Sequence, residues 1–283
     1  MAEDLKVSYL SKDDLICPVC STSFQREELL SGGGRLIAGP ITDELHRLYE
    51  PSSRYGDVYP LVYQATVCPA CWFASMEKDF PALPASAREP AWRDRNKRIQ
   101  DICGIFPELD FHGNRDLITG AASQYLVMLC YDYFPPGAAP TIKQGIAALR
   151  ASWLFDELQS KKPGEHYNWL AQLFKKKAHF FYIEALNREQ AGQESIAEAK
   201  NLGPDTDKNY GYEGVLYLSA LLSFKYGPIE DAEYRKAYLG NAKRTLAKMF
   251  GLGKSSKNKP SPLLERARNI YDRINRELNE SDD

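Results

Sequence analysis

Two short cysteine pairs are the residues of this sequence best suited to chemistry. The segments Cys17 to Cys20 and Cys68 to Cys71 both read Cys-Pro-x-Cys. A Cys-x2-Cys turn directs two thiolates to one zinc ion at about 2.3 Å, and two such turns complete a tetrahedral shell. Such a shell leaves no position for a bound water. Cys17, Cys20, Cys68 and Cys71 therefore predict one structural Zn²⁺ per chain and no catalytic metal.

The two pairs lie further apart than the roughly 15 to 20 residues of a short zinc ribbon. The longer loop costs little, because closure entropy grows only logarithmically with length. Structural zinc contributes on the order of 10–16 kcal/mol of apparent binding free energy. Since a typical domain is stable by about 5–15 kcal/mol, we expect a small N-terminal module to depend on its metal.

A thiol oxidoreductase is an alternative for the second pair. A strand, Cys68 to Cys71 and a possible helix from Trp72 to Phe80 resemble the active turn of glutaredoxin-like folds. Two matching pairs favour the metal over this alternative. Cys130 lies in an apolar helical segment and is expected to be a buried packing residue. Cys103 stands alone at a predicted helix end, without a histidine pattern that would make it a nucleophile.

The remaining polar motifs predict no catalytic centre. Asp43 to His46 is not a zinc-protease motif, and His179 lies in a helical segment beside two phenylalanines, as a packed histidine would. Gly32 to Gly34 lacks the lysine and hydroxyl of a phosphate-binding loop and predicts a turn. The sequence therefore predicts a protein that is not an enzyme.

Charge argues against a general affinity for nucleic acid, because the formal net charge of the 283 residues is −2. Two basic clusters occur, and both are expected to form solvated helix faces. They are Arg88, Arg93, Arg95, Lys97 and Arg98, and Lys175 to Lys177. A zinc-ribbon protein that binds nucleic acid is the first alternative function, and it requires basic residues beside the ribbon.

The elements that position the cysteines are predicted to be strands and turns. Tyr59 to Val67 is rich in tyrosine and valine and reads as a strand leading into Cys68. Residues 1–80 form the predicted zinc-ribbon-like module. Residues 81–115 form a proline-rich connector with a short helix near Trp92 to Ile102. Residues 116–283 form the helical region, and the predicted class is α+β, mostly α.

Helical periodicity dominates the last of these regions. Breakers such as Pro135-Pro136 separate helices predicted at 117–133, 141–159, 165–190, 209–226, 231–250 and 261–278. A small residue followed by large ones recurs in them, best at Ala178-x3-Tyr182-x2-Ala185 and more loosely from Ala151, Ala242 and Ala267. This spacing predicts tetratricopeptide-like stacking. A plain antiparallel bundle is the alternative.

The N-terminal residues contain no apolar stretch of signal-peptide length, and no run approaches the roughly 20 apolar residues that span a bilayer. We therefore expect a cytoplasmic protein without a membrane span. In a reducing cytosol, paired cysteines are metal ligands or redox catalysts more often than disulfides.

Several blocks of the chain resemble a bacterial family catalogued as domain of unknown function 2225. The blocks are Cys17 to Cys20 with Ser31, Gly32 and Arg35; Tyr59 to Tyr63 with Val67 to Cys71, Phe73-Ala74 and Asp79-Phe80; Asp110 to Arg115; and Leu149 to Leu154. The resemblance implies a zinc-ribbon-like module, with the four cysteines as ligands, followed by tetratricopeptide-like helices, and it implies no reaction. One departure is that Ser21 and Trp72 follow the second cysteine of each turn, where glycine is usual.

Together these observations predict a zinc-binding adaptor or scaffold that binds an unidentified protein or peptide through its helical surface. The possible groove aromatics, most of which could equally belong to the core, are Tyr167, Trp169, Tyr210, Tyr212 and Tyr217.

Overall fold

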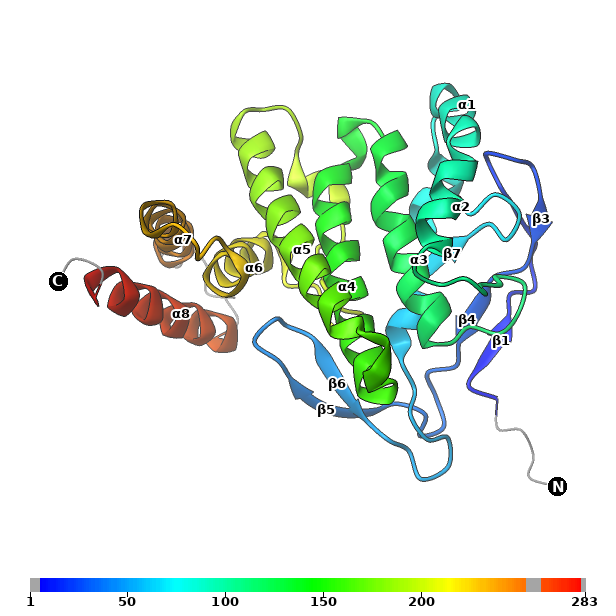
Figure 1. Cartoon of the computed structure of the whole chain (residues 1–283), viewed down its shortest axis with the longest axis horizontal. Helices are drawn as coiled ribbons and strands as arrows, with labels where there is room; N and C mark the ends of the chain where they lie inside the picture. The colour runs from blue at the N-terminus through cyan, green and yellow to red at the C-terminus, as the bar shows by residue number, and fades with distance from the viewer. Residues whose placement is uncertain (1–5, 253–260, 281–283) are drawn as a thin grey trace.

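Small β-hairpins make up the N-terminal part of the chain and helices make up the rest, in a computed structural model that describes residues 6–252 and 261–280 (Figure 1). The strands are β1 (Ser8–Leu10), β2 (Leu15–Ile16), β3 (Ser23–Phe24), β4 (Glu27–Leu29), β5 (Ile37–Ile41), β6 (Arg47–Glu50), β7 (Ala65–Val67) and β8 (Ala74–Met76). The α-helices are α1 (Ala85–Arg93), α2 (Arg95–Cys103), α3 (Leu117–Cys130), α4 (Pro140–Lys161), α5 (Tyr167–Gln190), α6 (Gly211–Tyr226), α7 (Ala232–Leu252) and α8 (Ser261–Glu280). Short 3-10 helices are η1 (Pro60–Tyr63), η2 (Glu77–Ala82), η3 (Tyr131–Tyr133), η4 (Pro136–Ala138), η5 (Pro163–Glu165) and η6 (Ile196–Ala199). The predicted class, α+β and mostly α, is confirmed.

The strands form four separate antiparallel pairs, β1 with β4, β2 with β3, β5 with β6 and β7 with β8. Two of them carry the cysteine turns. Cys17 to Cys20 connects β2 to β3, and Cys68 to Cys71 connects β7 to β8. Each Cys-Pro-x-Cys segment is therefore the tip of a hairpin.

Two local predictions around the second pair are wrong. The segment from Tyr59 to Val67 is a strand only from Ala65 onward, since residues 60–63 form η1. Pro60 begins that turn, because its ring fixes φ and it has no N–H to donate to a strand ladder. The possible helix from Trp72 to Phe80 is instead β8 followed by η2.

The connector holds two helices where one was predicted. Its alanine-rich start, Ala85 to Ala91, is helical, as the high helix propensity of alanine allows. Asp94 separates α1 from α2, and α2 covers most of the segment expected to be helical.

The helices predicted after residue 116 are confirmed, with ends that differ by a few residues. Each of the helices from α3 to α8 packs against the helix next to it in the sequence. The small residues of the repeat pattern are buried, namely Ala151, Ala178, Ala242 and Ala267. Within the described residues, every helix is too short or too polar to cross a membrane.

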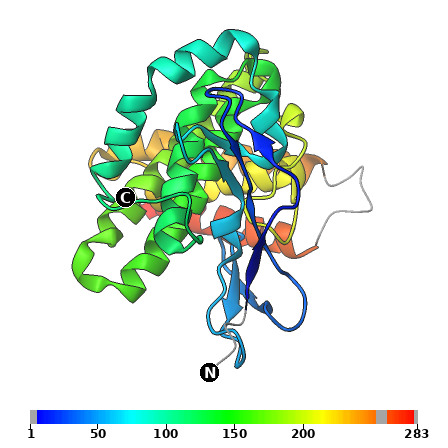
Figure 2. The same ribbon diagram turned by 90° about the vertical axis from the view of Figure 1, so that its right-hand side faces the viewer.

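One continuous apolar core joins the hairpins to the helices, with buried residues from Cys17 to Ile274. Helix α3 packs on β7, β8 and η1. Gly120 permits this approach, because a Cβ there would lie 2.8 Å from Cγ2 of Val62. Strands β1, β3, β4 and β7 lie with helices α1 and α2 on the right-hand side of the molecule in Figure 1, the side that faces the viewer in Figure 2. The boundaries at residues 80 and 115 stay predictions.

The β5–β6 hairpin reaches into the helical region and binds elements far away in sequence. The carbonyl of Asp43 accepts a hydrogen bond from the Tyr217 hydroxyl at 2.8 Å. Arg266 of α8 donates to the carbonyls of Thr42 and Ile41 at 2.7 and 3.0 Å. These contacts attach the tip of the hairpin to α6 and α8.

Candidate metal centre

The four cysteines predicted as ligands come together at one point. Their sulfur atoms all lie within 4.8 Å of one another. Two of these contacts join the two hairpins, at 3.6 Å from Cys17 Sγ to Cys71 Sγ and at 3.5 Å from Cys20 Sγ to Cys68 Sγ. A regular tetrahedron of thiolates with metal bonds of about 2.3 Å has edges of about 3.8 Å. The arrangement therefore fits four thiolates around one cation.

The two cysteine turns have the same backbone geometry. In each, the carbonyl of the first cysteine accepts a hydrogen bond from the N–H four residues on, and its own N–H donates to the carbonyl five residues on. All four of these bonds measure 2.9 Å. Ser21 and Trp72, the residues that follow the second cysteines, have φ of 61° and 55°. The turns thus adopt the left-handed conformation that glycine favours, with other residues in its place.

Burial and crowding set the electrostatics of the cluster. Cys17, Cys68 and Cys71 are at most 1% exposed, and Cys20 is partly exposed. Contact with Cys17 lowers the pKa of the Cys68 thiol far below its ordinary value, and the same contact raises the pKa of Cys17 to about 12. Contacts with Cys17 and Cys68 raise the pKa of Cys71 strongly. Without a metal ion, the cluster stabilises one thiolate through contacts with the neighbouring thiols. A bound cation would allow all four thiols to ionise.

Arg98 supports the second turn from α2. Its guanidinium donates to the carbonyls of Cys71 and Trp72 at 2.8 and 3.1 Å, and the residue is 4% exposed. The prediction that Arg98 lies on a solvated face is therefore wrong. Helical spacing could have predicted the burial of Arg98, because Arg98 lies four residues before the buried Ile102 and therefore on the same side of the helix.

The prediction of a solvated face is also wrong for Lys175, in the second basic cluster. It is 8% exposed and pairs with Asp156 at 2.7 Å. The buried Phe174 and Ala178 beside it in α5 show that this part of the helix faces inward.

The two cysteines outside the cluster lie apart from it. Cys130 on α3 is fully buried, as predicted, and its sulfur accepts the N–H of Ala74 in β8 at 3.4 Å. Burial raises the pKa of the Cys130 thiol to about 11. Cys103 is partly exposed at the end of α2. Cys130 therefore supports the β7–β8 hairpin by packing.

A further contact ties the hairpins to α3. The backbone N–H of Arg115 donates to the Glu27 carboxylate at 2.6 Å, and its guanidinium donates to the Ser123 hydroxyl at 2.6 Å. Burial lowers the pKa of Arg115 to about 10. This residue, the last of the segment from Asp110 to Arg115, joins β4 to the first turns of α3.

Comparison with known proteins agrees with the resemblance seen in the sequence. The model of the family described as "Uncharacterized protein conserved in bacteria (DUF2225)" matches residues 10–274. A protein of Borreliella burgdorferi, named "Uncharacterized protein", is 41% identical over 274 residues, which cover 96% of this chain and 98% of that protein. No solved structure matches the chain. The chain belongs to the bacterial DUF2225 family.

Proposed function

We propose that Cys17, Cys20, Cys68 and Cys71 bind one structural Zn²⁺ per chain. The convergence of four sulfur atoms within 4.8 Å carries this proposal. Thiolate ligands in a tetrahedral arrangement favour zinc over magnesium or calcium, which bind oxygen. The ion would hold two hairpins together that have only two and three residues in each strand. Its role is to stabilise the fold.

The burial of the second cysteine pair argues against a thiol oxidoreductase. An attacking thiolate needs access to its substrate. Cys68 and Cys71 are both fully buried, and β8 follows them in place of the helix that a glutaredoxin-like turn requires. The structural metal therefore accounts better for this pair.

Metal analysis of single variants tests the zinc proposal. We expect about one zinc per chain in the wild-type protein and a large loss in Cys17→Ser and Cys68→Ser. Cys103→Ser is the matched control, since Cys103 lies outside the cluster, and it should keep its zinc. Chelation should lower the melting temperature of the wild type and of Cys103→Ser. Full metal content and stability in Cys17→Ser and Cys68→Ser would overturn the proposal.

We further propose that the protein is a non-enzymatic adaptor of the bacterial cytoplasm, with a tetratricopeptide-like array as its binding surface. Trp169 and Phe180 of α5 support this proposal, because they are 66% and 60% exposed. Eleven residues make about three helical turns, so both side chains lie along one face of α5. Large exposed aromatics aligned in this way are typical of protein-binding surfaces. Two other groove candidates, Tyr167 and Tyr217, are instead core residues.

Nucleic acid is the second candidate partner, and one contact favours it. On α1 and α2, the Arg95 guanidinium lies 3.9 Å from the ring centre of the exposed Trp92, an arrangement that can stack on a base. The nearby Arg93 and Lys97 are each paired with an aspartate, at 3.8 and 2.7 Å. This pairing reduces their attraction for phosphate, so the adaptor ranks first.

Affinity capture from native extract, with and without nuclease, separates the two partners. The Trp169→Ala/Phe180→Ala variant should lose bound proteins that the wild type retains after nuclease treatment. Trp92→Ala is the matched control, since it removes an exposed aromatic from another surface, and it should retain them. Equal capture by all three proteins would contradict the adaptor. Bound nucleic acid that only Trp92→Ala loses would favour the alternative.

A further inference from the structure

A second site lies in the region where the β5–β6 hairpin meets α4. A cavity of about 210 Å³ opens between β6, the segment through η1 and α4. Its lining includes His46, Tyr59, Leu61, Leu154 and Glu157. An apolar cavity of about 150 Å³ is large enough to hold benzene. The space therefore admits a small organic molecule.

His46 is held in one orientation at the edge of this cavity. Its Nδ1 lies 2.5 Å from Oδ2 of Asp205, whose side chain is 1% exposed. The backbone N–H groups of Arg47 and Thr206 also donate to the Asp205 carboxylate, at 2.7 and 2.6 Å. Burial alone would raise the pKa of Asp205, but the bonds from His46 and the two N–H groups hold it below its ordinary value. Asp205 is therefore a carboxylate that can accept a hydrogen bond from Nδ1–H of His46.

This bond decides what His46 offers to the cavity. When Nδ1 of a neutral imidazole is the donor, Nε2 carries the lone pair and is an acceptor. Asp205 is outside the cavity lining, whereas His46 is part of it. The Nδ1 edge thus faces Asp205 and the opposite edge of the ring is free to face a ligand.

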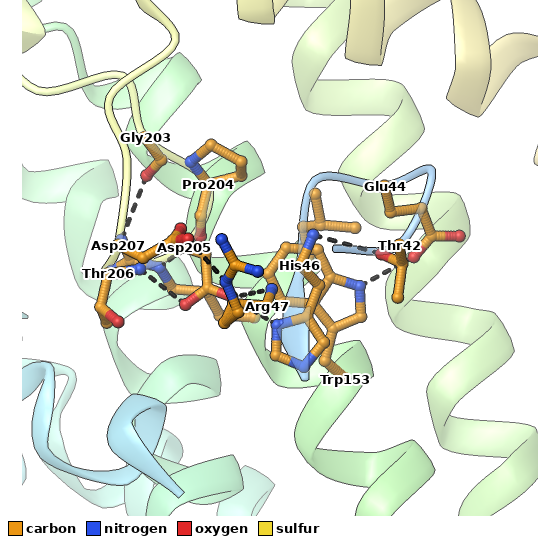
Figure 3. A network of polar contacts seen from close by, with 12 residues as sticks. Thr42, Glu44, His46, Arg47, Trp153, Gly203, Pro204, Asp205, Thr206 and Asp207 are labelled. Atoms are coloured by element: carbon orange, nitrogen blue, oxygen red, sulfur yellow. Dashed lines mark hydrogen bonds and ion pairs between the residues drawn. The ribbon is translucent and has the colours of Figure 1, made fainter. Parts of the chain in front are cut away.

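Trp153 fixes the plane of the imidazole. The two rings are stacked, with centroids 4.3 Å apart and an interplanar angle of 11° (Figure 3). The indole Nε1 donates to the Glu44 carboxylate at 2.7 Å, and Lys225 contacts that carboxylate at 3.0 Å. Trp153 and Asp205, which are both buried, therefore fix the plane of the His46 ring and the orientation of its Nδ1 before any ligand arrives.

Glu157 supplies the negative charge. It lines the cavity from α4 and is partly buried, and burial raises the pKa of its carboxyl. Within the described part of the chain it has no hydrogen bond or ion pair. The nearby cations are engaged elsewhere, since Lys161 pairs with Asp57 at 2.5 Å and Arg47 with Asp207 at 2.9 Å. The uncommitted charged group of the cavity is thus the Glu157 carboxylate, and Nε2 of His46 is an acceptor in the tautomer whose Nδ1 donates to Asp205.

We propose that this cavity binds a small primary ammonium compound with an apolar body. The ammonium group would donate to the Glu157 carboxylate and to Nε2 of His46, and its body would lie against Leu61 and Leu154. An opposite charge favours the ionised form of a carboxyl, so the ligand would itself offset the effect of burial on Glu157. The site is independent of the metal centre, whose residues lie in the β2–β3 and β7–β8 hairpins.

Binding of benzylamine, propylamine and benzyl alcohol to the full-length, metal-loaded chain tests this proposal. Calorimetry and saturation-transfer NMR at neutral pH should detect binding of at least one amine with a Kd below about 10 mM. Benzyl alcohol, which has the shape of benzylamine without its charge, should bind at least about tenfold more weakly. Failure of both amines to bind, or equal binding of the alcohol, would overturn the proposal.

Variants locate the bound amine. Glu157→Gln keeps the side-chain volume and should weaken amine binding by about tenfold or more. Glu165→Gln is the matched control on an exposed residue outside the cavity, and it should bind like the wild type. His46→Phe should also weaken binding, provided that circular dichroism shows a folded chain. If that variant does not fold, Glu157→Gln decides, and unchanged amine affinity in it would refute the site.

Discussion

The guanidinium of Arg98 donates to the carbonyl of Cys71 at 2.8 Å and so connects α2 to the second cysteine turn. The same side chain donates to the carbonyls of Trp72 and Ala91. Buried carbonyls that lose a charged donor cost more than an ordinary hydrogen bond contributes. Arg98 therefore stabilises the candidate metal centre from outside its sulfur atoms.

Replacement of Arg98 by methionine should lower the free energy of unfolding by about 2–4 kcal/mol, because three buried carbonyls lose their donor. Chemical denaturation measures this change. Arg93→Met is the control, since the Arg93 side chain is 68% exposed, and it should stay within about 0.5 kcal/mol of the wild type. Equal stability of the two variants would show that the Arg98 bonds contribute nothing to the fold.

The left-handed conformation of Ser21 predicts a substitution that stabilises the protein. An L-residue with positive φ is strained by about 1–2 kcal/mol relative to glycine, and glycine loses about 0.5–1 kcal/mol more backbone entropy on folding. Ser21→Gly should therefore raise the free energy of unfolding by about 0.5–1 kcal/mol. The same change at Ser23, which is in β3, should lower it. Destabilisation by both changes would contradict the positive φ of 61° at Ser21.

His179 should make stability depend on pH. Burial, and secondarily Arg235, lower its pKa from 6.5 to about 4. His179 therefore binds a proton below about pH 6.5 in the unfolded chain but only below about pH 4 in the folded chain. The His179 contribution is fully present above pH 6.5 and is lost as the pH falls to 4, by up to about 3 kcal/mol.

Denaturation curves between pH 7 and pH 4 measure this loss. His179→Gln removes the titrating group, so the difference in stability between wild type and variant should shrink or reverse as the pH falls. His112→Gln is the control on a histidine that is 70% exposed, and its curve should parallel that of the wild type. A difference independent of pH would refute a neutral, buried His179.

Gly120 allows α3 to approach η1, and a methyl group there should be destabilising. Alanine in place of a helical glycine normally stabilises by about 0.5–1 kcal/mol. Here the new Cβ would lie 2.8 Å from Val62 Cγ2 and 3.1 Å from its Cα, and overpacking costs about 1–3 kcal/mol. The clash should outweigh the propensity, so Gly120→Ala should melt at a lower temperature. Gly137→Ala, which meets nothing within 4 Å, should not.

The amino-acid sequence alone determined the four cysteines of the cluster and the helices after residue 116. Both are local properties, because two Cys-x2-Cys turns and a 3.6-residue apolar period can be read from short segments. The strand expected to begin at Tyr59 does not form there for an equally local reason, because Pro60 has no backbone N–H to donate.

Only the tertiary structure decided which groups support these elements. Arg98 reads as one more surface cation, and His46 as one of several scattered histidines, until folding places them against partners far away in the chain. His46 meets Trp153 and Asp205 across more than a hundred residues. Such contacts depend on how whole elements pack, and neither spacing nor propensity encodes that arrangement within any one segment.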